Sequence, residues 1–90
     1  MKTFPLTISS PDGELFRGEA QMILVRGTEG ELAVLADHVP FVTGIAKGRC
    51  VVITAAEERK EGEMEAGILT VASDSVTALT SGVTWKEYQA

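Results

Sequence analysis

Apolar and polar residues alternate from the start of the chain, which predicts a half-buried first strand. Phe4, Leu6 and Ile8 fall on one face of that strand, with Thr or Pro between them. Pro5 has no N–H to donate, so this strand is expected at a sheet edge or with that nitrogen facing away from the ladder. The run Ser10-Pro11-Asp12-Gly13 predicts a turn, because Pro presets φ and Gly accepts a positive φ.

Short runs rich in β-branched and apolar residues recur along the rest of the chain, separated by turn residues. We expect further strands over residues 14–17, 19–26, 32–35, 41–45, 49–55, 63–66, 68–72 and 76–79. Gly18 is expected to break the first two apart, and the charged run 57–62 is expected to be a solvated hairpin tip. No helical period appears before residues 85–89, which could begin a helix before the chain stops. The chain is therefore predicted to be all-β, with roughly eight to ten strands in a sandwich or barrel.

Length and charge narrow the classes of partner. Ninety residues, 44% of them hydrophobic and 23% charged, fit one globular domain. The formal net charge is −5 and the basic residues are scattered, which argues against binding to nucleic acid or to an anionic membrane surface. No run approaches the roughly 20 apolar residues that span a bilayer. We expect no nucleic-acid partner, and membrane association only through another protein.

Residues that carry chemistry are few. Cys50 is the single cysteine and lies in an apolar run, which is typical of a buried small hydrophobe. His38 is the single histidine, and neither a nucleophile motif nor a metal-ligand set surrounds it. The glycines do not have the spacing of a phosphate-binding loop. We predict no catalytic residue, no metal and no cofactor, and a role in docking onto other proteins. The run Met22-Ile23-Leu24-Val25, apolar on both faces, predicts a strand that is buried on both sides or covers a partner.

Two sequence blocks within residues 25–48 are more specific than the strand pattern. They are Glu29-Gly30-Glu31-Leu32 and His38-x-Pro40-x-x-Thr43. With Phe16-Arg17-Gly18 before them and the apolar segments 67–71 and 74–79 after them, they resemble the epsilon subunit of rotary F-type ATP synthases, called delta in mitochondria. The resemblance covers nearly the whole chain. It departs from the family at Ala33, where a Gly is usual, and at Ala36-Asp37, where Pro-Gly is usual; Asp tolerates a left-handed conformation better than most residues.

The resemblance implies a ten-stranded β-sandwich. We expect the sandwich to occupy residues 1–84, and residues 85–90 to be a tail or the start of a helical domain that is absent. In the family a C-terminal helical hairpin follows the sandwich, inhibits the motor and in some members binds ATP. The chain stops at Ala90, about where that hairpin begins, so we expect neither the hairpin nor ATP binding.

The resemblance also implies a mechanical function. Family members are non-catalytic rotor subunits of the central stalk, which join the gamma subunit to the c-ring and couple proton or sodium transport to ATP synthesis. This chain is accordingly expected to be a peripheral subunit at the cytoplasmic face of a bacterial plasma membrane, or at an organellar inner or thylakoid membrane. The alternative from the strand pattern alone is a free-standing β-sandwich that binds a ligand or peptide, for which an exposed aromatic platform is expected.

Residue by residue, the resemblance predicts two interfaces. The c-ring interface is expected at Glu29, Gly30 and Glu31, because c-ring loops typically present Arg and acidic residues complement it. The gamma interface is expected at Ser10, His38 and Thr43, with Met22 and Leu24 as further candidates.

Overall fold

The computed structural model describes residues 2–86, which form nine strands and no helix. The strands are β1 (Phe4–Ser10), β2 (Gly13–Gly27), β3 (Gly30–Leu35), β4 (Phe41–Ile45), β5 (Gly48–Thr54), β6 (Arg59–Met64), β7 (Gly67–Val71), β8 (Val76–Thr80) and β9 (Val83–Trp85). Within this part of the chain no helix is long and apolar enough to cross a membrane.

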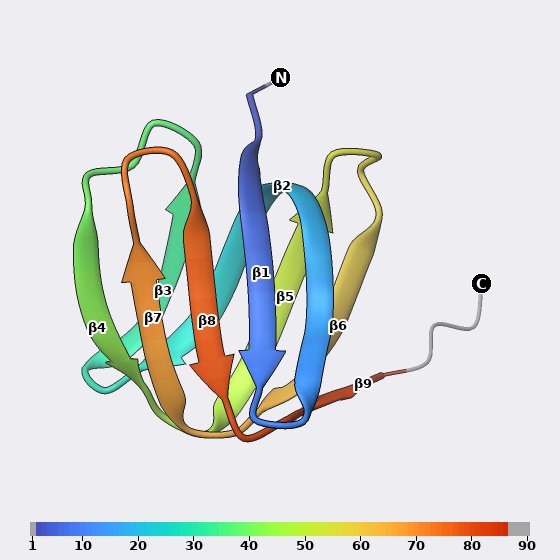
Figure 1. The fold of residues 1–90 in the computed structure, drawn as a ribbon, viewed down its shortest axis with the longest axis vertical. Helices are drawn as coiled ribbons and strands as arrows, with labels where there is room; N and C mark the ends of the chain where they lie inside the picture. Colours follow the sequence, from blue (N-terminus) through green and yellow to red (C-terminus); the bar gives the residue numbers. More distant parts are fainter. Residues whose placement is uncertain (1, 87–90) are drawn as a thin grey trace.

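The strands lie in two layers, and β2 belongs to both (Figure 1). Residues 13–20 of β2 pair with β1, whereas residues 20–24 pair with β5 and residues 22–27 pair with β3. We call β4, β7, β8, β1 and the first half of β2 the front sheet. The second half of β2, with β3, β5, β6 and β9, is the back sheet. The predicted all-β sandwich is confirmed.

The expected break at Gly18 is wrong, which accounts for part of the difference between nine strands and the predicted ten. Gly18 keeps its place in the β1 ladder opposite Leu6, so β2 runs unbroken for 15 residues. A glycine without a side chain still offers its N–H and C=O to a ladder. The ring of Phe16 lies 3.6 Å from the place where a Cβ of Gly18 would stand. The glycine therefore leaves room for an aromatic ring instead of ending the strand.

Two expectations in the second half of the chain need correction. The charged run 57–62 is a hairpin tip only at residues 57–58, because β6 begins at Arg59 and pairs with β5 from there. Trp85, taken as the first residue of the tail, is instead the last residue of β9, which pairs with β6. Pairing with a neighbouring strand outweighs intrinsic preference at such positions. Residues 87–90 of the predicted tail lie outside the described residues.

The core lies between the two sheets and is apolar. Phe4, Leu6 and Ile8 are buried on one face of β1, as their alternation predicts. Strand β1 is not an edge strand, since it also pairs with β8, but that ladder starts at Leu6, after Pro5. Cys50 is fully buried, and burial raises the pKa of its thiol to about 12, so it is an unreactive core residue.

Candidate functional site

The acidic segment predicted to meet the c-ring is a tight hairpin between β2 and β3. Gly27 and Gly30 are paired, and Thr28-Glu29 forms the two-residue connection. Gly30 has φ +127°, a conformation that side chains disfavour. A Cβ at Gly27 would stand 2.8 Å from the Leu32 side chain and 3.0 Å from the Gly30 carbonyl oxygen. The two glycines fix the shape of the turn that carries Glu29.

The two glutamates of this hairpin differ in their surroundings. Glu29 is exposed and makes no hydrogen bond or ion pair within residues 2–86. Glu31 is held at two points by Arg49 of β5, through Nε–Oε2 at 3.2 Å and Nη2–Oε1 at 3.3 Å. The hydrogen bond from Arg49 to Glu31 raises the pKa of the Arg49 guanidinium. Only one of the two predicted contact carboxylates is thus open to a partner's cation.

Ser10 and Thr43, predicted to face gamma, lie on the front sheet without touching each other. Ser10 ends β1, where its hydroxyl donates to the Gly13 carbonyl at 3.3 Å and accepts from the Asp12 N–H at 3.2 Å. Thr43 is half-buried in β4, opposite the buried Leu69 of β7. Ser10 shapes the β1–β2 turn, which lies at the same end of the sandwich as the acidic hairpin (Figure 1).

His38 lies at the opposite end of the sandwich, in the connection between β3 and β4. Its Nδ1 is 2.8 Å from the Leu35 carbonyl oxygen, and its Nε2 is 2.6 Å from the Ala72 carbonyl oxygen. The ring also meets Phe4 edge-on, with centroids 5.6 Å apart. A neutral imidazole can donate to one of these oxygens and an imidazolium to both. His38 therefore ties the 36–40 segment to the β7–β8 turn.

Asp37 stands where the resembled family usually has Gly, and it takes the conformation that a Gly would take. Its φ is +67°, in the left-handed region that Asp tolerates. Its carboxylate receives a hydrogen bond from Lys2 Nζ at 2.7 Å. The substitution leaves the turn before His38 in place.

The outer face of the front sheet holds an exposed apolar patch that the sequence reasoning missed. Val42 is 67% exposed, Leu79 53% and Ile68 50%. Ile68 and Leu79 are cross-strand partners, and Gly44 opposite Ile68 leaves that side chain open. We call Val42, Ile68 and Leu79 the front patch. A hollow of about 280 Å³ adjoins it, between Pro11, Ala66, Ile68 and Leu79.

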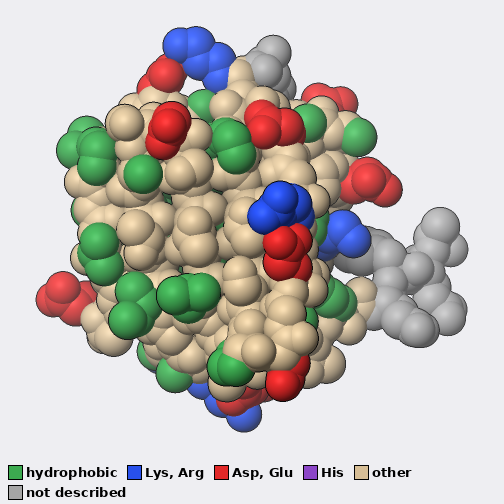
Figure 2. All heavy atoms as spheres, in the orientation of Figure 1, with side chains coloured by type: hydrophobic (Ala, Val, Ile, Leu, Met, Phe, Trp, Pro, Cys, Tyr) green, Lys and Arg blue, Asp and Glu red, His purple; other side chains and the backbone are tan. Residues whose placement is uncertain are grey.

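The front patch lies in a setting without charge. Strands β1, β4, β7 and β8 contain no charged residue. Figure 2 shows charged side chains only around the margins of β4, β7 and β8 on this face. The sequence already carried this signal. Asp, Glu, Lys and Arg are absent from these four segments, and apolar side chains occur on both faces of β4.

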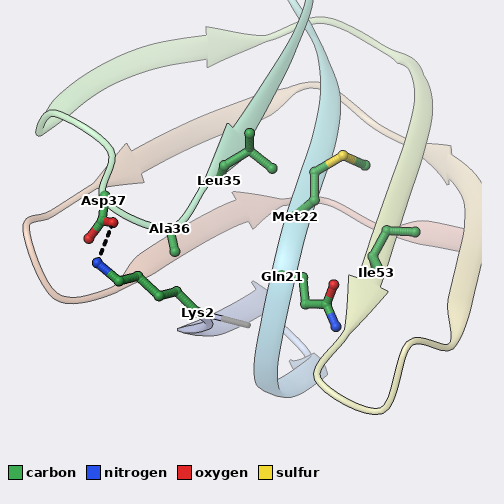
Figure 3. Close-up of a pocket in the computed structure, with 7 residues that line it drawn as sticks. All are labelled: Lys2, Gln21, Met22, Leu35, Ala36, Asp37 and Ile53. Atoms are coloured by element: carbon green, nitrogen blue, oxygen red, sulfur yellow. Dashed lines mark hydrogen bonds and ion pairs between the residues drawn. The ribbon is translucent and has the colours of Figure 1, made fainter.

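Met22 and Leu24, the further gamma candidates, lie on the other side of the molecule. Both are half-buried on the outer face of the back sheet. There Met22, Leu35 and Ile53 line a groove of about 270 Å³ with the Lys2–Asp37 ion pair at its rim (Figure 3). The structure does not bring these two residues together with Ser10, His38 or Thr43.

Comparisons with known proteins agree on one family. The family described as "ATP synthase, Delta/Epsilon chain, beta-sandwich domain" matches residues 3–86. The chain is 37% identical over 86 residues to the sodium-ion-specific ATP synthase epsilon chain of Acetobacterium woodii, covering 96% of this chain and 65% of that one. It is 34% identical over 86 residues to the ATP synthase epsilon chain of Caldanaerobacter subterraneus subsp. tengcongensis, covering 96% and 62%. The chain thus spans less than two thirds of the length of these relatives.

Solved structures share the fold at lower identity. A chain of the Euglena gracilis mitochondrial ATP synthase structure that contains OSCP, F1 and the c-ring superposes with a TM-score of 0.85 at 24% identity, over 92% of this chain and 53% of that one. A chain of the Tetrahymena thermophila mitochondrial ATP synthase central stalk and c-ring superposes with a TM-score of 0.75 at 14% identity, over 92% and 66%. At these identities the likeness shows the β-sandwich fold.

Proposed function

Because this chain belongs to the family of ATP synthase delta/epsilon-chain β-sandwich domains, we propose that it is a rotor subunit of the central stalk. In this role it joins the gamma subunit to the c-ring and transmits rotation that couples proton or sodium transport to ATP synthesis. It is non-catalytic, and it reaches the cytoplasmic face of the membrane only through its partners. A rotor coupling needs a stiff body, which a densely packed sandwich supplies.

The observation that carries this proposal is the exposed apolar patch of the front sheet, which lies among the four strands without charged residues, β1, β4, β7 and β8. Interface cores are depleted in charge, because burying an unpaired ion costs more than the contact returns. Val42, Ile68 and Leu79 offer apolar area without that cost. Of the predicted contacts, Ser10 lies at the margin of the front patch, since it follows Ser9, the partner of Leu79, whereas Thr43 pairs with the buried Leu69 and so lies on the core side of β4. We assign the gamma interface to this face.

The c-ring contact is assigned to the end of the sandwich that carries Glu29, Gly30 and Glu31. This end presents a rigid two-residue turn rather than a long mobile loop, which suits a contact that must hold under torque. The names of the structural relatives include a c-ring and a central stalk, which is consistent with this assignment.

The test is reconstitution with partners from the same organism. The full chain is mixed with purified gamma subunit, then with gamma and detergent-solubilised c-ring, and each mixture is resolved by size-exclusion chromatography. We expect co-elution with gamma and a further complex with the c-ring. A chain that is folded by circular dichroism yet elutes apart from gamma would overturn the rotor proposal.

A further inference from the structure

The hairpin assigned to the c-ring carries a cation, Arg26, as well as a carboxylate, Glu29, that are both unpaired within residues 2–86. We propose that it is a two-signed contact, in which Glu29 binds a basic side chain and Arg26 binds an acidic side chain of the same partner loop. This inference rests on the proposed c-ring contact and specifies the chemistry of the loop that fits it: a protein loop that bears both charges.

Glu31 does not neutralise Arg26, although the two are cross-strand partners. The Glu31 carboxylate is held at both oxygens by Arg49 instead. Within residues 2–86 Arg26 has no ion pair or side-chain hydrogen bond. In a chain of net charge −5, an arginine beside a glutamate that is already bound is free for a carboxylate from outside.

The side chain of Arg26 is positioned by packing. A Cβ at Gly48 would stand 2.6 Å from Cδ, 2.9 Å from Cβ and 3.3 Å from Cγ of Arg26. The aliphatic stem therefore lies over Gly48, in space that any other residue would fill. Holding the stem in place reduces the rotamer entropy that the guanidinium loses on binding. A guanidinium presents a planar fork that matches a carboxylate, which makes an acidic side chain its fitting partner.

The two-signed contact and a purely acidic contact predict opposite changes in affinity when the guanidinium of Arg26 is removed. If the partner loop were only basic, Arg26 would repel it, and removing the guanidinium would tighten binding. If the loop carries an acidic side chain opposite Arg26, removing the guanidinium weakens binding. The direction of one change in affinity therefore distinguishes the two.

The experiment compares Arg26→Gln with Lys60→Gln in the full chain. Gln keeps the Cβ, Cγ and Cδ atoms that lie over Gly48. Lys60, on β6, is an exposed cation without an ion pair in the described residues, so both variants change the net charge equally. Binding to solubilised c-ring with gamma from the same organism is measured at low and moderate salt. We expect Arg26→Gln to weaken binding by at least about fivefold at low salt and Lys60→Gln to change it by less than about twofold.

Each outcome decides between the alternatives. Arg26→Gln binding as well as Lys60→Gln, or more tightly, would overturn the two-signed contact while leaving the c-ring assignment standing. A wild-type chain that binds gamma but shows no added affinity for gamma with the c-ring would overturn the c-ring assignment itself, and this inference with it. Matching thermal melts of both variants exclude a loss of fold.

Discussion

The two outer faces of this sandwich are built from the same kind of strand but differ in how they use charge. The front sheet strands β1, β4, β7 and β8 have no charged residue, and their outer face exposes Val42, Ile68 and Leu79. The back sheet exposes apolar side chains too, around the groove at Met22. The Lys2–Asp37 ion pair lies at the rim of that groove, and the back sheet carries further ion pairs, among them Arg49–Glu31 and Lys86–Glu61. Burying the front patch therefore desolvates mainly apolar groups, whereas burying the outer face of the back sheet also desolvates charged groups.

The difference matters because docking must remove water from whatever it covers. Covering the front patch removes water mainly from methyl groups and hydroxyls, which is favourable or nearly neutral. Covering the back groove also brings a partner against the Lys2–Asp37 ion pair at its rim, and the desolvation of that pair offsets part of the apolar gain. Exposed apolar area alone therefore does not identify the docking face, whereas apolar area without charge does.

The largest expected effect follows from breaking this contrast at matched positions. Ile68→Asp on the front face and Leu35→Asp on the back face each charge a side chain that is about half exposed, at 50% and 58%. We expect Ile68→Asp to weaken gamma binding by about 30-fold or more, about 2 kcal/mol, because the new carboxylate must be buried. Leu35→Asp should leave gamma binding within about twofold. Isothermal titration calorimetry measures both.

A change of sign at the same position sharpens this result. Ile68→Lys should weaken binding about as strongly as Ile68→Asp, since both lose apolar contact and bury a charge. Weakening by one sign only would mean that the front sheet binds gamma through electrostatic attraction, which would contradict an apolar docking face.

His38 joins the two faces, since it lies between β3 of the back sheet and β4 of the front sheet. His38→Ala removes its contacts with the Leu35 and Ala72 carbonyl oxygens and with the Phe4 ring. We expect a loss of about 1–3 kcal/mol in the free energy of unfolding, measured with denaturant. Gamma affinity should fall less than it does for Ile68→Asp, because the ring nitrogens are already engaged within the chain. The opposite ranking would make His38 a direct gamma contact.

At the other end of the sandwich, Thr80 makes a similar connection, where the chain passes from β8 to β9. Its hydroxyl is buried and donates to the Glu65 carbonyl oxygen at 2.7 Å. Thr80→Val keeps the shape but leaves that oxygen without its donor, so we expect about 1–2 kcal/mol of destabilisation. Thr70→Val, on the exposed face of β7, is the matched control and should be nearly neutral. Equal melting temperatures for the two variants would contradict the role of the buried hydroxyl.

The smallest effect concerns the charges of the back sheet. The hydrogen bond from Lys86 to Glu61, with the charges of Lys86, Arg59 and Arg49, holds the pKa of Glu61 below its usual value. A lowered folded-state pKa contributes stability above the unfolded value, about 4.3 for Glu, and that contribution is lost as the pH falls through the folded value. Glu61→Gln should therefore be slightly less stable than wild type at neutral pH and equal to it in acid. Glu29→Gln, which loses no partner among the described residues, is the control and should show no such gap in stability at neutral pH.

The fold was predictable from the sequence to the extent that side-chain alternation decides it. The alternation of Phe4, Leu6 and Ile8 predicted one buried face, and the β-branched run in β5 predicted another strand. The charged β6 and the short β9 were not predictable from composition. They are strands because β6 forms backbone hydrogen bonds with β5, and β9 forms them with β6. The break expected at Gly18 was wrong for a related reason. The hydrogen-bonded ladder to β1 holds this glycine in a strand.

The candidate site was predicted in part. The hairpin at Glu29 followed from its glycines and from family resemblance, but the pairing of Glu31 with Arg49 joins residues 18 apart across β2 and needs the register to be seen. The front patch combines residues from β4, β7 and β8, which local patterning treats separately. The absence of charge from these strands was the signal that was overlooked.

The central claim is that the outer face of the front sheet, at the charge-free strands β4, β7 and β8, is the face that binds gamma. The most direct measurement follows the backbone amide signals of the isotopically labelled chain by NMR as unlabelled gamma subunit is added. We predict that the largest shifts and line broadening fall on β4, β7 and β8, with Val42, Ile68 and Leu79 at their centre, while Met22, Leu35 and Ile53 are little affected. Changes centred on Met22, Leu35 and Ile53, with the front sheet unperturbed, would contradict this claim.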